Sequence, residues 1–343
     1  MNEVEVAPQQ ALDRFLQLTA IEGRSGEEKG VAEHLIEVLR TAGLPDSCVQ
    51  FDGAENRTRI GGNCGNLIVD LPGDGDGPCT LLSAHMDTVP VCLGSQPLVQ
   101  GDYVISDSPT GLGADNRAGC CAVLTAGVER LQSGRTDLAP AKLLFTVQEE
   151  IGLEGARHLD VSKLGQVDRA INFDGGNVDK LTMGAIGGER MEIRLTGLPA
   201  HAGLAPQEGI SAIVIASKAI ATLFDQQWLG KVQKESGIGT SNIGVIRGGE
   251  ATNVVTPEVI LKAEARSHQA AFRSEIVRHI REAFERAADE VQNEAGATGS
   301  VEFTSNVDYE SFRLSDDDAS VEAAEACLKE IGRSPFREMA NGG

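Results

Sequence analysis

Histidine and acidic residues follow short apolar runs at several places in the first half of the chain, and their types suit metal binding and proton transfer. In SAHMDTVP, His85 and Asp87 are two residues apart, so both side chains point the same way where a strand continues through them. This spacing suits an imidazole that binds a metal through one nitrogen while a carboxylate orients the other. A hydrogen-bonded turn is the alternative interpretation of this pair.

Three further segments carry carboxylates in comparable places. Asp115 ends the glycine-rich stretch of GLGADNRAG, where it either caps the following helix or bridges two metal ions. Glu149 and Glu150 end an apolar run, either as solvated charges or as like charges held together by a cation or a shared proton. Asp174 follows another apolar run in INFDGG, where a turn aspartate is the simpler interpretation.

Taken together, these segments supply one imidazole and several carboxylates. A mixture of nitrogen and oxygen ligands favours zinc, and manganese and cobalt are also suited to it. Ligands at this density are sufficient for two ions, and a water between two ions acts as hydroxide near neutral pH. A glutamate that is not a ligand is then available as a general base, so the residues predict a metal centre that activates water.

The elements that must position these residues alternate between strand and helix patterns. Apolar runs at 67–69, 80–82, 143–147 and 170–173 predict strands, and a helix is expected to begin near Arg117. The alternation predicts an α/β fold with a mixed sheet flanked by helices. The histidine and the acidic residues fall at the carboxyl ends of the predicted strands, where ligands bind in such sheets.

Two segments near these strands are interpreted as local structure. Ser25 and Glu28 have the spacing of a capping box, and apolar residues follow at helical intervals up to Gly43, which predicts an amphipathic surface helix. The loop LPGDGDGP at 71–78 lacks the ligand pattern of a calcium loop, and we expect a hairpin turn there.

After Met183 a self-contained set of predicted elements follows. One face of a long helix is marked by apolar residues, namely Phe272, Ile276, Ile280 and Ala283. Strands are expected near 190–195, 239–245, 259–265 and 301–303, with a helix at 210–224. We therefore expect a small α+β domain at 184–312, inserted into a larger catalytic domain formed by 1–183 and 313–343.

The composition excludes several classes of function. Lys and Arg total 30 against 51 Asp and Glu, and the net charge of −21 disfavours binding to nucleic acid. No apolar run approaches the ~18 residues needed to cross a bilayer, and the first ten residues lack the pattern of a signal peptide. We therefore expect a cytoplasmic protein without a membrane partner. Seven cysteines without a CxxC spacing favour reduced thiols over a disulfide framework.

In their order and separations, HMDTVP, GADNRAG, QEEIGLEGAR and FDGG resemble the M20 family of co-catalytic zinc peptidases, most closely its peptidase T branch of tripeptide aminopeptidases. The resemblance covers nearly the whole chain, because GLPAHAG and GGEATNVVTPEV are similar to the family's lid domain. It implies metal-dependent hydrolysis of peptide bonds in short peptides, with release of the N-terminal residue.

The resemblance also implies a ligand set for two zinc ions. His85 and Asp174 would bind one ion, Glu150 would bind the other, and Asp115 would bridge them. The carboxypeptidase and desuccinylase branches of the family tend to carry glutamate where this chain has Asp174. An aspartate there favours aminopeptidase chemistry.

Further residues acquire roles from the same resemblance. Asp87 would orient the histidine ligand, and Glu149 would take a proton from the bridging water and deliver it to the leaving amine. In the lid, His201 would stabilise the tetrahedral oxyanion, and Asn253 and Arg266 would contact substrate, with Arg266 suited to a peptide carboxylate. Pairing of Arg266 with a local acid is the alternative. Because the lid histidine often comes from a partner subunit, a homodimer is expected.

The chain departs from the family pattern at its end. The family has a last metal ligand, a histidine near the C-terminus, and no histidine lies beyond His279 here. The second zinc would then keep only Glu150 and Asp115, and we expect a truncated form of a longer protein. The alternative functions are an M20-type dipeptidase, carboxypeptidase or N-acyl amino acid deacylase, and a non-catalytic homologue. Intact Glu149 and Asp87 argue against the last of these.

Overall fold

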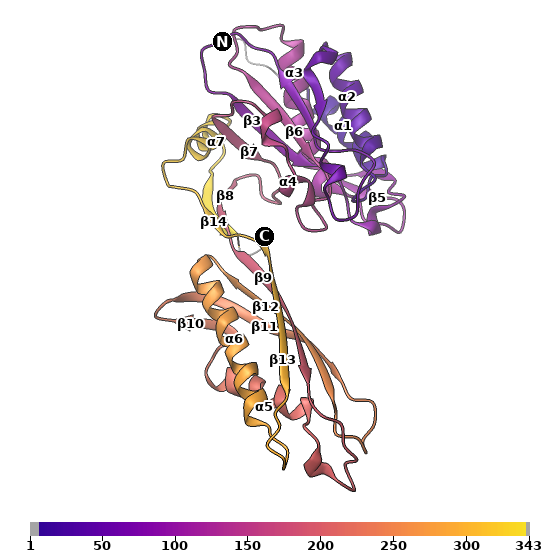
Figure 1. The fold of residues 1–343 in the computed structure, drawn as a ribbon. Coiled ribbons are helices and arrows are strands. Elements are labelled where there is room, and N and C mark those ends of the chain that lie inside the picture. The colour runs from indigo at the N-terminus through magenta and orange to yellow at the C-terminus, as the bar shows by residue number, and fades with distance from the viewer. Residues whose placement is uncertain (1–6, 341–343) are drawn as a thin grey trace. The chain divides into compact units, whose positions relative to one another are not determined.

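The structure is a computed structural model that describes residues 7–340 (Figure 1). The chain divides into two compact units. Among the described residues, unit 1 contains 7–178 and 322–332, and unit 2 contains 179–321 and 333–340. Helix α7 (Ala319–Glu330) begins in unit 2 and ends in unit 1.

Unit 1 is built on a mixed five-stranded sheet, which confirms the predicted fold class. Its strands lie in the order β1 (Val49–Phe51), β2 (Leu67–Leu71), β6 (Ala141–Thr146), β3 (Thr80–His85) and β7 (Arg169–Asn172). Strand β3 is parallel to both of its neighbours, β6 and β7, while β2 is antiparallel to β1 and β6. The carboxyl ends of β3, β6 and β7 therefore meet at one edge of the sheet.

Helices cover one face of this sheet: α1 (Pro8–Ala20), α2 (Lys29–Thr41) and α3 (Ala114–Gln132) (Figure 1). The strands alternate between the two faces. Leu143 and Phe145 pack into the core beneath these helices, whereas Leu144, between them, packs on the other face against Leu164. The shorter elements of unit 1 are η1 (Asp46–Cys48), η2 (Ala54–Asn56), η3 (Pro90–Cys92), β4 (Pro97–Gln100), β5 (Tyr103–Ser106), α4 (Glu154–Arg157) and η4 (Val161–Lys163).

The glycine-rich loop at 71–78 is not the hairpin turn that the sequence predicts. It joins β2 to β3, and these strands lie on opposite sides of β6. A Cβ atom at Gly73 would lie 2.2 Å from the carbonyl oxygen of Leu138, and one at Gly75 would lie 2.4 Å from that of Asp137. The glycines therefore allow the loop to approach the backbone that leads into β6.

The predicted capping box is also wrong. Helix α2 begins after Glu28, whose side chain makes no capping hydrogen bond. Ser25 Oγ instead donates to Asp87 Oδ2 at 2.7 Å, and Glu28 Oε1 accepts the backbone N–H of Gln148 at 2.9 Å. Each side chain thus has a partner far along the chain, which a local spacing cannot reveal.

Unit 2 contains an antiparallel five-stranded sheet. Its strands lie in the order β10 (Gly230–Lys234), β11 (Gly237–Gly248), β12 (Glu258–Ser267), β9 (Gly187–Thr196) and β13 (Ser300–Tyr309). A single hydrophobic core joins this sheet to two helices, α5 (Ala212–Asp225) and α6 (Ala270–Glu290) (Figure 1). The predicted apolar face of α6 is confirmed, since Phe272, Ile276, Ile280 and Ala283 are all buried.

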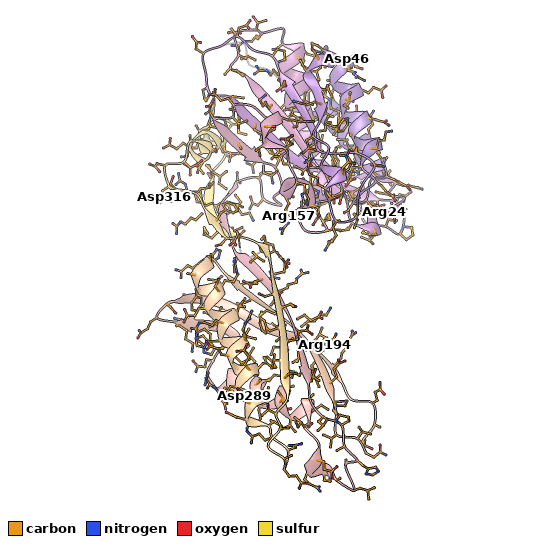
Figure 2. The ribbon with its side chains drawn as sticks, in the orientation of Figure 1. Arg24, Asp46, Arg157, Arg194, Asp289 and Asp316 are labelled. Atoms are coloured by element: carbon orange, nitrogen blue, oxygen red, sulfur yellow. The ribbon has the colours of Figure 1, made fainter. Side chains whose placement is uncertain are left out.

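Ion pairs link neighbouring strands of the unit 2 sheet. Arg194 of β9 lies 2.5 Å from Glu258 of β12, measured from Nη1 to Oε2 (Figure 2). A second, three-stranded sheet joins β14 (Phe312–Arg313), β8 (Lys180–Ala185) and β15 (Phe336–Ala340), and η5 (Pro206–Glu208) precedes α5. Among residues 7–340, no helix combines the length and apolar character needed to cross a membrane.

Candidate metal centre

The candidate site lies where the three parallel strands of unit 1 end. His85 is the last residue of β3, the central strand of the three. Glu149 and Glu150 follow β6 on one side of it, and Asp174 follows β7 on the other. Asp115 lies near the N-terminus of α3, which packs against β3. The fold thus brings residues from four separate segments to one edge of the sheet.

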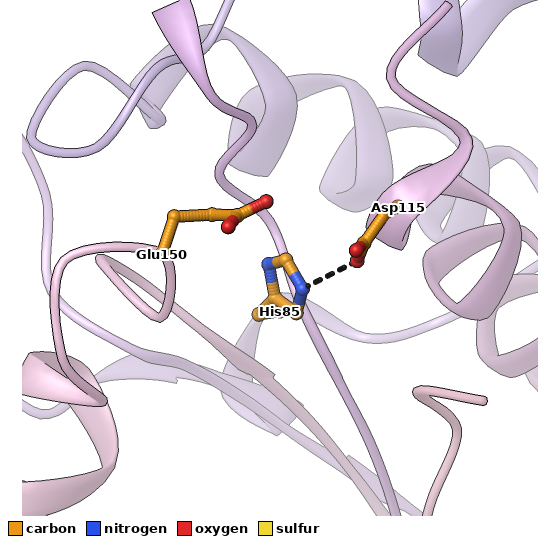
Figure 3. Close-up of side chains that lie close together, drawn as sticks. All are labelled: His85, Asp115 and Glu150. Carbon is orange, nitrogen blue, oxygen red and sulfur yellow. Dashed lines mark hydrogen bonds and ion pairs between the residues drawn. The ribbon is translucent and has the colours of Figure 1, made fainter. Parts of the chain in front are cut away.

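Carboxylates surround the imidazole of His85. Its Nε2 lies 3.1 Å from Asp115 Oδ1, 3.6 Å from Asp174 Oδ1 and 3.8 Å from Glu149 Oε2. His85, Asp115 and Glu150 each offer a ligand atom within 4.8 Å of the others (Figure 3). One nitrogen and two oxygens at this spacing form a donor set suited to a divalent metal ion.

Asp87 connects the histidine to the two glutamates. Its Oδ1 lies 3.2 Å from His85 Nδ1 and accepts the backbone N–H of Glu149 at 2.9 Å. Its Oδ2 accepts the backbone N–H of Glu150 at 3.1 Å and the hydroxyl of Ser25 at 2.7 Å. Since Asp87 is fully buried, its carboxylate fixes both the imidazole ring and the backbone that carries the glutamates.

The crowding of charges shifts several pKa values. Burial lowers the pKa of His85, but the nearby carboxylates of Asp174 and Asp87 outweigh it and raise the pKa to about 11. Burial raises the pKa of Asp87, but hydrogen bonds from His85 and Ser25 outweigh it, and the pKa lies below its usual value. Burial raises the pKa of Glu149 to about 7, which is the range that suits a general base near neutral pH.

Glu150 differs from Glu149 in its surroundings. Burial is the largest cause of its raised pKa, and the charge of Asp115 adds to it. Two neighbouring carboxylates of like charge favour a bound cation between them. Glu150 and Asp115 are therefore suited to hold a cation together with His85.

Asp115 does not cap helix α3. Asp115 lies within the bounds of α3, but its backbone has φ −84° and ψ 107°, which is not a helical conformation. The capping contact belongs to the next residue, because Asn116 Oδ1 accepts the N–H of Gly119 at 3.0 Å. Asn116 Nδ2 also donates to the carbonyl oxygen of Phe173 at 2.7 Å. The carboxylate of Asp115 is thereby left to face His85.

The three predicted substrate-binding residues belong to unit 2. His201 forms an isolated antiparallel bridge with Val254, and the N–H of Ala202 donates to the carbonyl oxygen of Asn253 at 2.9 Å, so the segments of His201 and Asn253 adjoin. Arg266 lies on β12 and donates two hydrogen bonds to Glu264, at 3.2 Å from Nε and 3.1 Å from Nη2. Arg266 therefore pairs with a local acidic residue, Glu264, which is the alternative that the sequence analysis gave for this arginine.

Several contacts of the site have no sequence signal of their own. The Sγ of Cys120 donates to the carbonyl oxygen of His85 at 3.0 Å. Gln148 is fully buried beside the glutamates, and its Nε2 donates to the carbonyl oxygen of Gly61 at 2.8 Å. In the sequence, Ser25 is recognised only as the first residue of a predicted capping box. These residues act through contacts across the fold, which composition and periodicity do not report.

Two family profiles match the chain. Residues 184–292 match the M20 peptidase dimerisation domain, and residues 66–196 match peptidase family M28. The first match lies within unit 2, and the second covers the strands and loops that hold His85, Asp115, Glu150 and Asp174.

Known proteins resemble the chain over nearly its whole length. The protein YqjE of Bacillus subtilis is 34% identical over 333 residues, which cover 97% of this chain and 84% of YqjE. A tripeptidase structure from Staphylococcus aureus has a TM-score of 0.87 and 33% identity, over 98% of this chain and 86% of that one. The aminopeptidase PepT of Bacillus cereus has a TM-score of 0.87 and 32% identity over the same shares.

Proposed function

This chain belongs to the M20 family of peptidases, and from that premise we propose that it is a metal-dependent aminopeptidase that releases the N-terminal residue of short peptides. The observation that carries the proposal is the group of His85, Asp115 and Glu150 at the sheet edge, in a chain similar over nearly its whole length to a tripeptidase and to an aminopeptidase. Tripeptides are the proposed substrates.

The residues present fit the metal that this chemistry needs. In the proposed arrangement His85 and Asp174 would hold one zinc ion, Glu150 would hold a second, and Asp115 would serve both. Manganese and cobalt have compatible ligand preferences. A divalent ion bound there polarises the scissile carbonyl and acidifies water at neutral pH. The support from this structure is the donor set itself, one imidazole nitrogen among carboxylate oxygens.

Asp87 is proposed to set the tautomer of His85. The Oδ1 and the backbone carbonyl oxygen of Asp87 lie 3.2 Å and 3.1 Å from His85 Nδ1. Both oxygens are hydrogen-bond acceptors, so a neutral imidazole carries its proton on Nδ1. Nε2 then keeps its lone pair for a metal ion held between it and the carboxylates of Asp115 and Asp174. The charge of Asp87 also increases the basicity of that nitrogen.

Glu149 is proposed as the general base and acid of the reaction. Its Oε2 lies 3.8 Å from His85 Nε2, at the centre of the group, while its backbone N–H is bound by Asp87. In the proposed reaction its carboxylate accepts a proton from the attacking water and passes that proton to the amine nitrogen that leaves. The two adjacent glutamates thereby have different tasks, since Glu150 binds metal.

Unit 1 is proposed as the catalytic part of the chain, and unit 2 as the lid that forms a homodimer. The match of residues 184–292 to the M20 dimerisation domain supports the second assignment. His201, Asn253 and Arg266 are proposed to bind substrate, with His201 stabilising the oxyanion. For Arg266 to bind a peptide carboxylate, its hydrogen bonds to Glu264 must be exchanged for substrate contacts.

The test is hydrolysis of matched tripeptides by the purified chain in zinc, manganese or cobalt. One peptide has free ends, one is N-acetylated and one is amidated at its C-terminus. An aminopeptidase cleaves the free peptide and leaves the acetylated peptide intact, and it cleaves the amidated peptide with a higher KM where Arg266 binds the terminal carboxylate. The variant Glu149→Gln is the control for a contaminating peptidase, because it is expected to bind metal and lack activity.

Other outcomes identify the alternatives. Cleavage of the acetylated peptide but not of the amidated one indicates a carboxypeptidase. Release of acetate from an N-acetyl amino acid indicates a deacylase, and cleavage of dipeptides alone indicates a dipeptidase. No hydrolysis of any of these substrates with all three metals contradicts the proposal and favours a non-catalytic homologue.

A further inference from the structure

The segment that carries the two glutamates is held by its backbone. Three successive N–H groups each donate to a buried carboxylate: Gln148 to Glu28 Oε1 at 2.9 Å, Glu149 to Asp87 Oδ1 at 2.9 Å, and Glu150 to Asp87 Oδ2 at 3.1 Å. Asp87 and Glu28 are both fully buried. Glu28 therefore supplies the first of three contacts that fix the path of the chain through the site.

Gln148 needs such support because of its backbone conformation. Its φ is +54°, in the left-handed region that residues other than glycine rarely adopt. Such conformations persist where the surrounding structure imposes them. The N–H of Gln148 is bound by Glu28, and its Nε2 donates to the carbonyl oxygen of Gly61 at 2.8 Å. The turn that directs Glu149 toward His85 is thus imposed by residues from an early part of the chain.

Glu28 is fully buried, although it lies at the start of helix α2, where an exposed residue would serve. Its Oε1 accepts two backbone N–H groups, from Gly26 at 2.9 Å and from Gln148, while its Oε2 is buried and has no hydrogen-bond partner. Burial raises its pKa to about 7. An exposed capping residue would begin α2 without this desolvation, so helix formation alone does not explain a buried glutamate at this position.

The neighbouring Ser25 reaches the same site. Its hydroxyl donates to Asp87 Oδ2, the atom that also binds the N–H of Glu150. The segment from Ser25 to Glu28 therefore makes two contacts that hold the backbone of the glutamates. Glu28 binds the N–H of Gln148 directly, and Ser25 binds Asp87, which in turn binds the N–H groups of Glu149 and Glu150.

We propose that Glu28 is a positioning residue for catalysis, which acts by holding the backbone of Gln148 and thereby the carboxylate of Glu149. This inference rests on the proposed role of Glu149 as general base. Glu28 is fully buried, and its Oε1 binds the backbone of Gly26 and Gln148 rather than a proposed metal ligand. Its contribution is the hydrogen bond that its Oε1 accepts from Gln148.

Three variants test this. Glu28→Leu removes the acceptor without leaving a charge or a large cavity, and Glu28→Gln keeps an amide oxygen at Oε1 to accept the same N–H. Glu27→Gln is the matched control, because Glu27 is exposed and pairs at 2.6 Å with Arg24, which is labelled in Figure 2. Each variant is assayed for kcat and KM on a tripeptide, for metal bound per chain, and for hydrogen–deuterium exchange of the peptide spanning 147–152 in the metal-free protein.

We expect Glu28→Leu to lower kcat by about 10- to 100-fold, the size expected when a reacting group is misplaced, with little change in KM or in metal content. Exchange over 147–152 should rise in Glu28→Leu. Glu28→Gln should return both kcat and exchange close to the wild-type values, and Glu27→Gln should change neither. Wild-type kcat in a folded, metal-loaded Glu28→Leu protein would overturn the proposal, as would equal defects in the Leu and Gln variants.

The exchange measurement separates this inference from the proposed function. If the wild-type protein hydrolyses no peptide, the proposed function fails, but raised exchange in Glu28→Leu and its rescue in Glu28→Gln still show that Glu28 holds the segment. If the wild-type protein is active and exchange over 147–152 is the same in all variants, the positioning role is excluded and the proposed function stands.

Discussion

Asp87 Oδ1 lies 3.2 Å from Nδ1 of His85, and both side chains are buried. Because a carboxylate in this position orients the ring and increases the basicity of the other nitrogen, we expect Asp87→Asn to weaken metal binding by about 10- to 100-fold. Asparagine keeps one oxygen to accept a backbone N–H, so the fold should survive. Competition with a chelator of known affinity measures the change.

The control for Asp87→Asn is Asp137→Asn, which removes an exposed carboxylate that pairs with Arg135 at 2.8 Å. It alters the net charge of the protein by the same amount. Equal metal affinity in the two variants would mean that Asp87 affects the metal only through overall charge, and its proposed role would be lost.

Replacement of Glu149 by Gln should separate metal binding from catalysis. An amide cannot accept the proton of the attacking water, and proton transfer contributes ~10²–10⁴-fold, so kcat should fall by that factor. Metal content should stay at the wild-type level, because Glu149 is not among the proposed ligands. Turnover near the wild-type rate in a metal-loaded Glu149→Gln protein would show that another group moves the proton.

The elements that local periodicity specifies were predicted well. The buried face of α6, which carries Phe272 and Ile280, was predictable because apolar residues that recur at helical intervals along a long helix indicate one buried face. The strand at Leu143 was found for a similar reason, as a short apolar run buried on both faces. The loop at 71–78 was predicted wrongly because strand order depends on β6, which lies some seventy residues further along the chain, at about Ala141.

The candidate site shows the same limit. Three strands that lead to His85, Glu150 and Asp174 were expected to share an edge, since ligands bind at the carboxyl ends of parallel strands. The support of that edge was not foreseen, because Ser25 and Glu28 have the spacing of a helix cap, and only the folded chain shows that they contact other segments. The roles of the site residues stay predictions until they are measured.

Asn116 is expected to stabilise the start of α3 and the path of the chain at Asp115. Its Oδ1 accepts the N–H of Gly119, and its Nδ2 donates to the carbonyl oxygen of Phe173. Loss of a capping contact costs ~1 kcal/mol, and loss of the part-buried hydrogen bond to Phe173 adds about 0.5–1.5 kcal/mol. Asn116→Ala should therefore lower the free energy of unfolding by roughly 1.5–2.5 kcal/mol, measured by urea denaturation.

Asn116→Asp provides the comparison for this measurement. It keeps the capping oxygen toward Gly119 and replaces the donor toward Phe173 with a charged oxygen, so its loss of stability is an upper bound on the second contact. If Asn116→Ala is as stable as the wild-type protein, the capping role fails.

The buried carboxyl of Glu28 should make stability depend on pH. Burial and the charge of Asp87 raise its pKa from an ordinary 4.5 to about 7 in the folded protein. Between these values the folded state holds a proton that the unfolded state has lost, so the free energy of unfolding falls as the pH rises through this range. A shift of that size corresponds to about 3 kcal/mol by the time the carboxyl is fully ionised.

Glu28→Gln removes this contribution, because an amide does not titrate in this range. Urea denaturation of the wild-type protein and of the variant at about pH 5 and about pH 8 measures the effect, since other titrating groups are common to both proteins and cancel in the comparison. We expect the variant to gain stability relative to the wild type as the pH rises. The Glu27→Gln control should show no such trend, because Glu27 is exposed and its pKa is lowered by Arg24. A pH-independent difference between wild type and Glu28→Gln would mean that Glu28 is already ionised in the folded protein at pH 5, and that its buried charge is stabilised by the N–H groups of Gly26 and Gln148.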